Sequence, residues 1–390
     1  MIISTAERIS EVKEYYFATK LREIRQRKLQ GEDIINLGIG NPDMMPSEDV
    51  LKKLVATTLE AGNHGYQPYK GIPTLRKAMA GWYLDAFGVS LEPDTEVLPL
   101  IGSKEGIMHI SMAFLDKGDK VLIPNPGYPS YGSAARLVGA EAEFYTLSAE
   151  NGWYPDLAEL RQRDLTKVKI MWLNYPHMPT GTPAKEEVFH ELVTFAKEHK
   201  ILLCHDNPYS YVLNPEPMSM LNIPGAKEVA IELNSLSKSH NMAGWRVGMV
   251  VGEAAYINAI LRVKSNMDSG MFAPLQLAAA EALQISRQWH MERNQVYAHR
   301  REIVREMIKV LNCQADPDQV GMFMWAKIPP HQKSAEAFSE EILNKCSVFI
   351  TPGFIFGTAG DTYIRISLCT PAERLEEALG RLKAVFALIS

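Results

Sequence analysis

Residues 235–248 read Ser235-Leu-Ser-Lys238-Ser-His-Asn-Met-Ala-Gly-Trp-Arg246-Val-Gly248, and an apolar, strand-like run at 229–233 precedes them. This loop brings a lysine, hydroxyl groups and an arginine into one short segment. The Lys238 amine can form a Schiff base with an aldehyde, and Ser235 and Arg246 can hold a phosphate. The loop therefore predicts a site for pyridoxal 5'-phosphate (PLP), a cofactor that carries both groups.

The segment 235–248 resembles the lysine loop of the class I and II aminotransferases, which are fold-type-I enzymes that depend on PLP. The resemblance implies that Lys238 holds the cofactor at rest and, when released, becomes the base that moves the Cα proton of the substrate. It also implies that Ser235, Ser237 and Arg246 bind the cofactor. A solvated basic loop on another α/β protein would look similar, so the remaining motifs decide between the two interpretations.

The composition is that of an ordinary globular protein. The chain has 390 residues, of which 46% are hydrophobic and 22% are charged, and this length predicts about two or three domains. The formal net charge of −5 argues against nucleic acid or an anionic membrane as a partner. We expect no membrane span, because no run of about 18 apolar residues occurs, and the first residues do not resemble a signal peptide.

The cysteines and histidines show no metal-binding pattern. The four cysteines are far apart and form no C-x-x-C pair; they are Cys204, Cys313, Cys346 and Cys369. This spacing argues against disulfides and a zinc site and favours a reducing cytoplasm. The ten histidines show no H-E-x-x-H spacing, so we expect no bound metal.

Short apolar runs alternate with helical segments between about residues 100 and 250. The runs include 120–123, 169–173 and 201–204. Such runs predict a buried, mostly parallel sheet that is flanked by helices, and hence an α/β fold. The loops that leave the carboxyl ends of these runs carry the unusual residues, and open α/β sheets bind their ligands at that edge. We expect residues 46–279 to form this large PLP-binding domain.

The two ends of the chain predict a second, smaller α+β domain, formed by residues 1–45 and 280–390. The expected elements are helices at 7–30, 334–345 and after Pro371, strands at 34–37, 323–326, 348–350 and 363–367, and a long helix at 275–311 that bridges the domains. Ser47 is a plausible cap for the helix that begins the large domain.

Asp206 follows the apolar run 201–205, and Tyr209 comes three residues later. A carboxylate below the PLP ring would keep the ring nitrogen protonated, which makes the ring an electron sink. The D-x-x-Y spacing resembles that of the family, in which the tyrosine hydrogen-bonds the ring oxygen O3′. An aspartate that merely caps a turn is the alternative, and the lysine loop downstream makes it the weaker one.

Two further loops complete the predicted cofactor site. Gly102, Ser103 and Lys104 precede a helical segment, and backbone N–H groups at a helix N-terminus bind anions. In the family this loop cradles the cofactor phosphate. Tyr128, within the sequence Asn-Pro-Gly-Tyr-Pro, matches the aromatic residue that stacks on the cofactor ring; its alternative is a partly buried turn tyrosine.

The resemblance also implies a homodimer with shared active sites. The segment Tyr66-Gln-Pro-Tyr-Lys-Gly71 is similar to one that crosses the dimer interface in this family. There the first tyrosine, here Tyr66, reaches the phosphate bound by the partner subunit.

Arg365 lies in the apolar run 363–367 and matches the arginine that binds the substrate α-carboxylate in the family. A planar guanidinium can hold a carboxylate through two parallel hydrogen bonds. A structural ion pair is the alternative, since an arginine inside a strand is costly unless it is paired. Gly40, on the N-terminal arm, is expected opposite that carboxylate.

Met178 is a departure from the family pattern. It stands before Pro-Thr-Gly, where the family usually has an asparagine that donates to O3′, and a thioether donates no hydrogen bond. Asn174 and His177 are the nearest possible substitutes. Losing one donor predicts a Schiff base with a higher pKa than is usual in the family.

Three functions are consistent with these motifs. The leading one is an aminotransferase that moves an amino group between an L-amino acid and a 2-oxo acid by a ping-pong mechanism. The chain most resembles the branch that contains LL-diaminopimelate, aspartate, alanine and methionine aminotransferases. A PLP-dependent C–S β-lyase on the same fold would use the same lysine. A non-catalytic PLP-binding regulator is disfavoured, because the chain has no basic patch.

Overall fold

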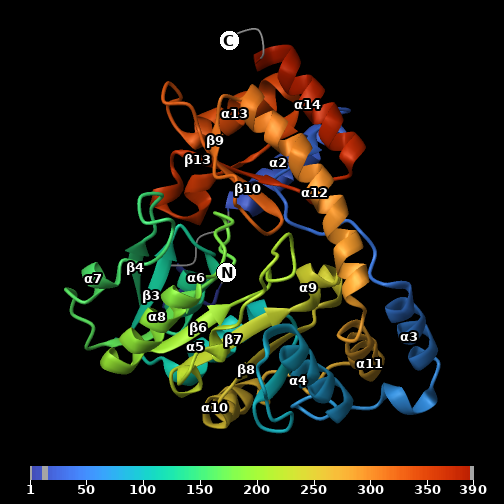
Figure 1. Cartoon of the computed structure of the whole chain (residues 1–390), viewed down its shortest axis with the longest axis vertical. Helices are drawn as coiled ribbons and strands as arrows, with labels where there is room; N and C mark the ends of the chain where they lie inside the picture. Colours follow the sequence, from blue (N-terminus) through green and yellow to red (C-terminus); the bar gives the residue numbers. More distant parts are fainter. Residues whose placement is uncertain (1, 11–15, 387–390) are drawn as a thin grey trace.

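The computed structural model describes residues 2–10 and 16–386. Figure 1 shows a large sheet with flanking helices in the lower part and a smaller sheet with its own helices above it. The long helix α12 (Arg287–Val310) runs between the two parts. The boundaries expected at residues 46 and 279 stay predictions.

The large sheet has seven strands and is mostly parallel, which confirms the predicted α/β fold. Strands β7, β6, β5, β3 and β4 are parallel, and β8 is antiparallel to both of its neighbours. In spatial order the strands are β2 (Val97–Leu100), β8 (Gly248–Gly252), β7 (Ala230–Ser235), β6 (Leu202–Asp206), β5 (Val168–Leu173), β3 (Lys120–Asn125) and β4 (Glu141–Thr146).

Both faces of this sheet are covered. On β5, Met171 and Leu173 belong to one hydrophobic cluster and Ile170 and Trp172 to another, as the alternation of side chains along a strand requires. Strands that are buried on both faces read as continuous apolar runs, which explains the sequence signal. The helices of this part are α3 (Glu48–Thr58), α4 (Pro73–Phe87), α5 (Ser103–Phe114), α6 (Ser130–Leu137), α7 (Leu157–Leu160), α8 (Glu186–His199), α9 (Leu236–Ser239), α10 (Ala254–Lys264) and α11 (Ala273–Ala282).

The smaller part joins the two ends of the chain. Its four-stranded antiparallel sheet has the order β12 (Thr351–Pro352), β13 (Tyr363–Ser367), β10 (Phe323–Lys327) and β9 (Gln314–Ala315). The N-terminal arm adds β1 (Ile35–Asn36), which pairs in parallel with β11 (Val348–Phe349). The helices are α1 (Glu7–Ser10), α2 (Tyr16–Leu29), α13 (Ala335–Cys346) and α14 (Ala372–Phe386).

Short 3-10 turns complete the described chain: η1 (Ala61–His64), η2 (Met220–Asn222), η3 (Ala226–Glu228), η4 (Ala243–Trp245), η5 (Gly353–Phe356) and η6 (Thr358–Gly360). Within the described residues, no helix combines the length and apolar character that crossing a membrane requires.

Two local expectations are corrected, and a third falls partly outside the described residues. The helix expected at 275–311 is interrupted after Ala282, because the Ser286 hydroxyl accepts a hydrogen bond from the Trp289 amide and starts a new helix there. The helix expected at 7–30 is described as α1 and α2, and residues 11–15 between them lie outside the described residues. Ser47 occupies the N-cap position of α3, but its side chain makes no capping hydrogen bond.

One ion pair fixes the N-terminal arm to α12. Arg300 donates from Nη1 and Nη2 to the two carboxylate oxygens of Asp43, at 2.7 Å each, and also to the Leu368 carbonyl at 3.1 Å. The Arg300 side chain is 6% exposed and the Asp43 side chain 24% exposed. Removing one partner of such a pair leaves a poorly solvated charge.

We therefore expect Asp43→Ala to lower the free energy of unfolding by about 2 kcal/mol, because Arg300 is left without its acid. Urea unfolding followed by tryptophan fluorescence would measure the change. The double variant Asp43→Ala/Arg300→Met is the control and should recover most of the loss. Equal destabilisation in the single and double variants would contradict this account.

Candidate active site

A cavity of about 750 Å³ opens between the two parts of the structure. The carboxyl ends of the large-sheet strands and the segments directly after them supply Tyr128, Asp206 and Lys238, while the smaller part supplies Phe323 and Arg365. Among the predicted site residues, the cavity wall also includes Gly40, Ser103, Lys104, Tyr209, Ser235, Ser237 and Arg246. The position is the one that an open α/β sheet offers to a ligand.

Lys238 lies in the short helix α9, directly after β7. Its Nζ donates a hydrogen bond to the Gly40 carbonyl oxygen. Burial lowers the pKa of Lys238 to about 8, and the cations Arg365 and Arg246 contribute to the shift, while Cys369 opposes it. A lysine with a lowered pKa has more of its amine in the neutral form near pH 7, and this form is the nucleophile.

Gly102, Ser237 and Arg246 form an anion cradle at the N-terminus of α5. Gly102 is the N-cap of this 12-residue helix and has a φ of +80°. A Cβ at Gly102 would lie 2.1 Å from Arg246 Nη2, so the glycine allows the guanidinium to approach the free N–H groups of the helix. Arg246 Nη1 donates to the Ser237 hydroxyl at 3.3 Å. Such a cradle fits a phosphate.

Asp206 presents one oxygen to the cavity wall. Its Oδ2 accepts a hydrogen bond from the Tyr131 hydroxyl at 2.9 Å, while its Oδ1 is buried without a partner among the described residues. Burial raises the pKa of Asp206 to about 6, and the bond from Tyr131 opposes that rise. An unpartnered buried carboxylate oxygen is costly, and the protonated ring nitrogen of PLP is a suitable donor for it.

The sequence motifs did not indicate Tyr131 as a site residue, although it stands three residues after Tyr128 at the start of a helix. The two rings meet edge to face, with centroids 5.6 Å apart, and Tyr131 stacks on Trp172 at 4.7 Å. Tyr209 also lines the cavity, and burial raises its pKa, which keeps the hydroxyl protonated as a donor. The i, i+3 spacing was the available signal for Tyr131.

Arg365 is buried, and its polar contacts within the described residues are to a backbone carbonyl and a sulfur. Its Nη2 donates to the Gly38 carbonyl at 2.8 Å, and its Nη1 lies 3.2 Å from the Met178 sulfur. The guanidinium also lies over the Phe323 ring, 3.9 Å from the centroid. Burial lowers the pKa of Arg365 to about 10. No carboxylate of the described residues pairs with it, so the structural ion pair considered as its alternative is not present there.

The two glycines of the arm have different contacts. The Gly38 carbonyl accepts from Arg365, whereas the Gly40 carbonyl accepts from Lys238. A Cβ at Gly40 would lie 2.2 Å from the Phe323 ring. Gly40 therefore lies close to the reactive lysine, and close packing rather than a turn requires the glycine there.

Neither neighbour of Met178 replaces the missing amide donor. Asn174 lines the cavity, but its Nδ2 donates to the Asp206 carbonyl at 2.6 Å and its Oδ1 accepts from the Met178 amide at 2.8 Å. His177 Nδ1 contacts the Thr180 hydroxyl at 2.7 Å, and burial lowers the pKa of His177 to about 3. His177 does not line this cavity.

Two predicted cofactor residues, Tyr66 and Gly102, are absent from the wall of the cavity. Tyr66 is 94% exposed. Gly102 has two neighbours, Ser103 and Lys104, that do line the cavity. The wall includes residues that sequence reasoning did not find, among them Phe17, Arg136 and Phe356. They come from distant segments, so no local motif indicated them.

The family model for aminotransferase class I and II matches residues 32–382. LL-diaminopimelate aminotransferase from Dehalococcoides mccartyi (strain ATCC BAA-2266 / KCTC 15142 / 195) is 43% identical, with 97% of each chain covered. The enzyme of that name from Moorella thermoacetica is 42% identical, with 98% of this chain and 99% of the relative covered.

Solved structures agree with these sequence relatives. Substrate-bound BacF from Bacillus subtilis superposes with a TM-score of 0.94 at 34% identity, with 98% of each chain covered. A single mutant of Thermus thermophilus aspartate aminotransferase gives a TM-score of 0.91 at 27% identity, with 98% of this chain and 100% of the other covered. The relatives do not favour the C–S lyase alternative. The chain thus belongs to the class I and II aminotransferase family and is a PLP-dependent aminotransferase of fold type I.

Proposed function

We propose that this aminotransferase uses Lys238 as both the attachment point of PLP and the proton carrier between the substrate Cα and the cofactor. PLP supplies the electron sink. The anion cradle of Gly102, Ser237 and Arg246 would hold the phosphate, together with Ser103, Lys104 and Ser235. Asp206 would accept a hydrogen bond from the protonated ring nitrogen, Tyr128 would cover the ring, and Tyr209 would donate to O3′.

A single observation supports the amino acid substrate best: the buried Arg365 guanidinium has no acid among the described residues and lies on the wall that also holds Lys238. A substrate α-carboxylate would supply that missing charge and would place Cα beside the lysine. Desolvated charges interact strongly, which makes this contact an effective means of orientation.

The rest of the wall suits a substrate with an apolar stem and an acidic far end. Tyr16, Phe17, Ile39 and Ile355 provide apolar surface. Arg136 adds a cation whose Nε is buried and has no partner among the described residues. LL-diaminopimelate has such a stem and a second carboxylate, and relatives at about 42% identity carry its name, so it is our first candidate donor.

We also propose a cytoplasmic homodimer with shared active sites. Tyr66 is exposed in one chain, together with Tyr69, Met267 and Phe272 from nearby segments. The backbone around Gly270 packs against that of Gln67, so these segments form one surface. Four free cysteines support a reducing compartment.

Adding LL-diaminopimelate to the PLP-loaded enzyme should convert the absorbance of the bound cofactor to that of pyridoxamine phosphate, and a 2-oxo acid should reverse this change.

Arg365→Lys should lower kcat/KM by roughly a hundredfold, because a point charge replaces two charge-assisted hydrogen bonds. Stopped-flow absorbance with a panel of L-amino acids measures both effects. Ammonia release without pyridoxamine phosphate would refute amino transfer, and an unchanged kcat/KM would refute the role of Arg365.

Gly102→Ala should weaken PLP binding by about tenfold or more, because the methyl group displaces Arg246 and the left-handed backbone is strained. Gly244→Ala is the matched control, since nothing lies within 4 Å of a Cβ there. Fluorescence titration of each apo-protein with PLP gives the dissociation constants. Equal affinity in the two variants would show that the cradle is placed wrongly.

Met178→Asn should lower the pKa of the Schiff base at Lys238 by up to about one unit, because an amide donor to O3′ stabilises its anionic form. Met178→Leu keeps the volume without adding a donor and should leave this pKa unchanged. Titration of the cofactor absorbance with pH measures both. If Met178→Asn leaves the pKa unchanged or raises it, the missing donor has no influence.

Tyr66→Phe should weaken PLP binding severalfold, and the neighbouring variant Tyr69→Phe should not, if the partner subunit's phosphate is the target of the Tyr66 hydroxyl. Light scattering should give twice the 43.7 kDa mass of one chain. A monomeric active enzyme, or wild-type affinity in Tyr66→Phe, would exclude the shared site.

A further inference from the structure

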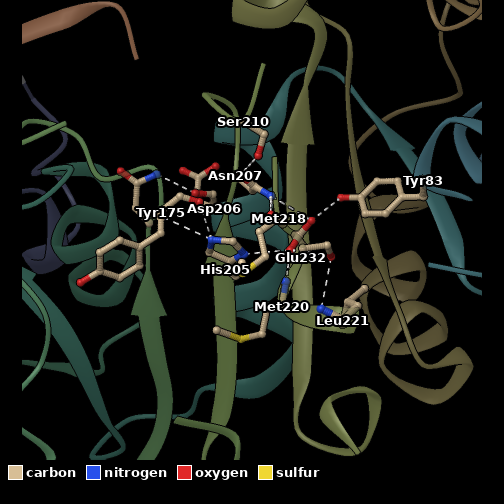
Figure 2. Close-up of polar contacts among 12 residues, drawn as sticks. Tyr83, Tyr175, His205, Asp206, Asn207, Ser210, Met218, Met220, Leu221 and Glu232 are labelled. Atoms are coloured by element: carbon tan, nitrogen blue, oxygen red, sulfur yellow. Dashed lines mark hydrogen bonds and ion pairs between the residues drawn. The ribbon is translucent and has the colours of Figure 1, made fainter. Parts of the chain in front are cut away.

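A buried polar cluster lies beside Asp206, and the catalytic roles proposed above do not use it. At its centre is Glu232, on β7, paired in register with His205 on β6. Both side chains are 0% exposed. Figure 2 shows this carboxylate surrounded by residues of α4, of the end of β6 and of η2; the labelled ones are Tyr83, His205, Asn207 and Met220.

Glu232 accepts hydrogen bonds on both carboxylate oxygens. The donors to Oε1 are the Tyr83 hydroxyl at 2.9 Å and the Asn207 amide at 3.2 Å; those to Oε2 are the Ser219 hydroxyl at 3.0 Å, the Met220 backbone amide at 3.0 Å and His205 Nδ1 at 2.8 Å. Two of these, the side-chain amide and the backbone N–H, can only donate. Donors on both oxygens favour the ionised carboxylate.

His205 has an oxygen atom beside each of its ring nitrogens. Its Nδ1 faces the Glu232 carboxylate, and its Nε2 lies 2.8 Å from the Tyr175 carbonyl oxygen. The Tyr175 amide lies 3.3 Å from the same nitrogen, so the carbonyl is the closer partner. Each ring nitrogen thus has an oxygen as its nearest partner, which is the arrangement that an imidazolium with two N–H donors would satisfy.

Two structural connections link the Glu232–His205 pair to Asp206. His205 and Asp206 are consecutive on β6, so the ring fixes the strand at the residue before the carboxylate. The Tyr175 backbone held by His205 continues to Asn174, which donates to the Asp206 carbonyl at 2.6 Å. Burial is the largest influence on the pKa of Asp206 and raises it; Tyr131 and the His205 cation lower it, and Glu232 raises it.

We propose that Glu232 and His205 are positioning residues that hold a buried ion pair beside Asp206 and thereby keep its carboxylate ionised and correctly placed for the cofactor ring nitrogen. This inference rests on the proposed role of Asp206. Glu232 keeps the imidazole protonated, and the imidazolium, which is nearer in the chain to Asp206, stabilises the second carboxylate. The hydrogen bonds of Glu232 and His205 also connect the carboxyl ends of strands β5, β6 and β7.

The first test is the protonation state of His205 in the wild-type protein. Nitrogen-15 NMR of histidine-labelled apo-protein and PLP-loaded protein, with His205→Gln to assign the signals, reports each ring nitrogen separately. We expect both nitrogens of His205 to be protonated near neutral pH, and only one in Glu232→Gln. Tyr83→Phe, which removes a hydrogen bond but no charge from the cluster, should keep the imidazolium. A neutral His205 in the wild type would overturn the proposal.

The second test is a double-mutant cycle in PLP affinity. Glu232→Gln should weaken PLP binding by about tenfold in the wild-type background and have almost no effect when Asp206→Asn is present. Equal losses in both backgrounds would mean that Glu232 acts only on general structure, and would overturn the proposal. If Asp206→Asn itself leaves PLP affinity and the cofactor spectrum unchanged, the role of Asp206 fails instead, whatever the state of His205.

Glu232→Gln removes a charge from a fully buried pair, so folding of each variant is checked by circular dichroism and thermal melting. If the single variant does not fold, the neutral double variant His205→Gln/Glu232→Gln takes its place, because it removes both charges and leaves no unpaired ion. The same loss of affinity and the same dependence on Asp206 are expected from it. Wild-type affinity in the folded double variant would overturn the proposal.

Discussion

The parallel pairing of β6 with β7 is the constraint on which the rest of the site depends. It aligns Asp206 with Leu233, so the carboxylate and the lysine loop after Ser235 leave the sheet at the same edge. Because both strands are fully buried, every polar group at their ends must be paired or face a ligand. The Glu232–His205 pair, the Tyr131 bond to Asp206 and the cavity itself all follow from that requirement.

The described wall of the cavity holds more cationic side chains than carboxylates. It contains the cations Lys104, Arg136, Lys238, Arg246 and Arg365, and one carboxylate, Asp206. Burial lowers the pKa of Lys238 and of Arg365, which is the direction expected when cations share a poorly solvated space. A cofactor phosphate and a substrate carboxylate would supply the missing negative charge. The same excess of cations would then contribute both to the affinity for these ligands and to their orientation.

The sequence predicted the family, the cofactor and the α/β fold, and it indicated candidate site residues in short motifs. Lys238, Asp206, Tyr128 and Arg365, which are far apart in the sequence, all line one cavity. Tyr131 and Arg136 were not found, because their roles depend on which face of α6 turns toward the strands. The break between α11 and α12 was also missed, since the capping bond of Ser286 competes locally with an otherwise continuous helical pattern.

The sequence alone determined which chemical groups are present and in which order, because a lysine in a loop of small polar residues, a glycine at a helix start and a strand arginine are recognisable from local patterns. Tertiary structure decided how each group is paired. Among the described residues, Arg365 has no acidic partner and one oxygen of Asp206 has no hydrogen-bond partner, while His205 joins two strands through a carboxylate 27 residues away. Such pairings depend on strand register and burial, which bring distant residues into contact and set the cost of leaving a charge alone.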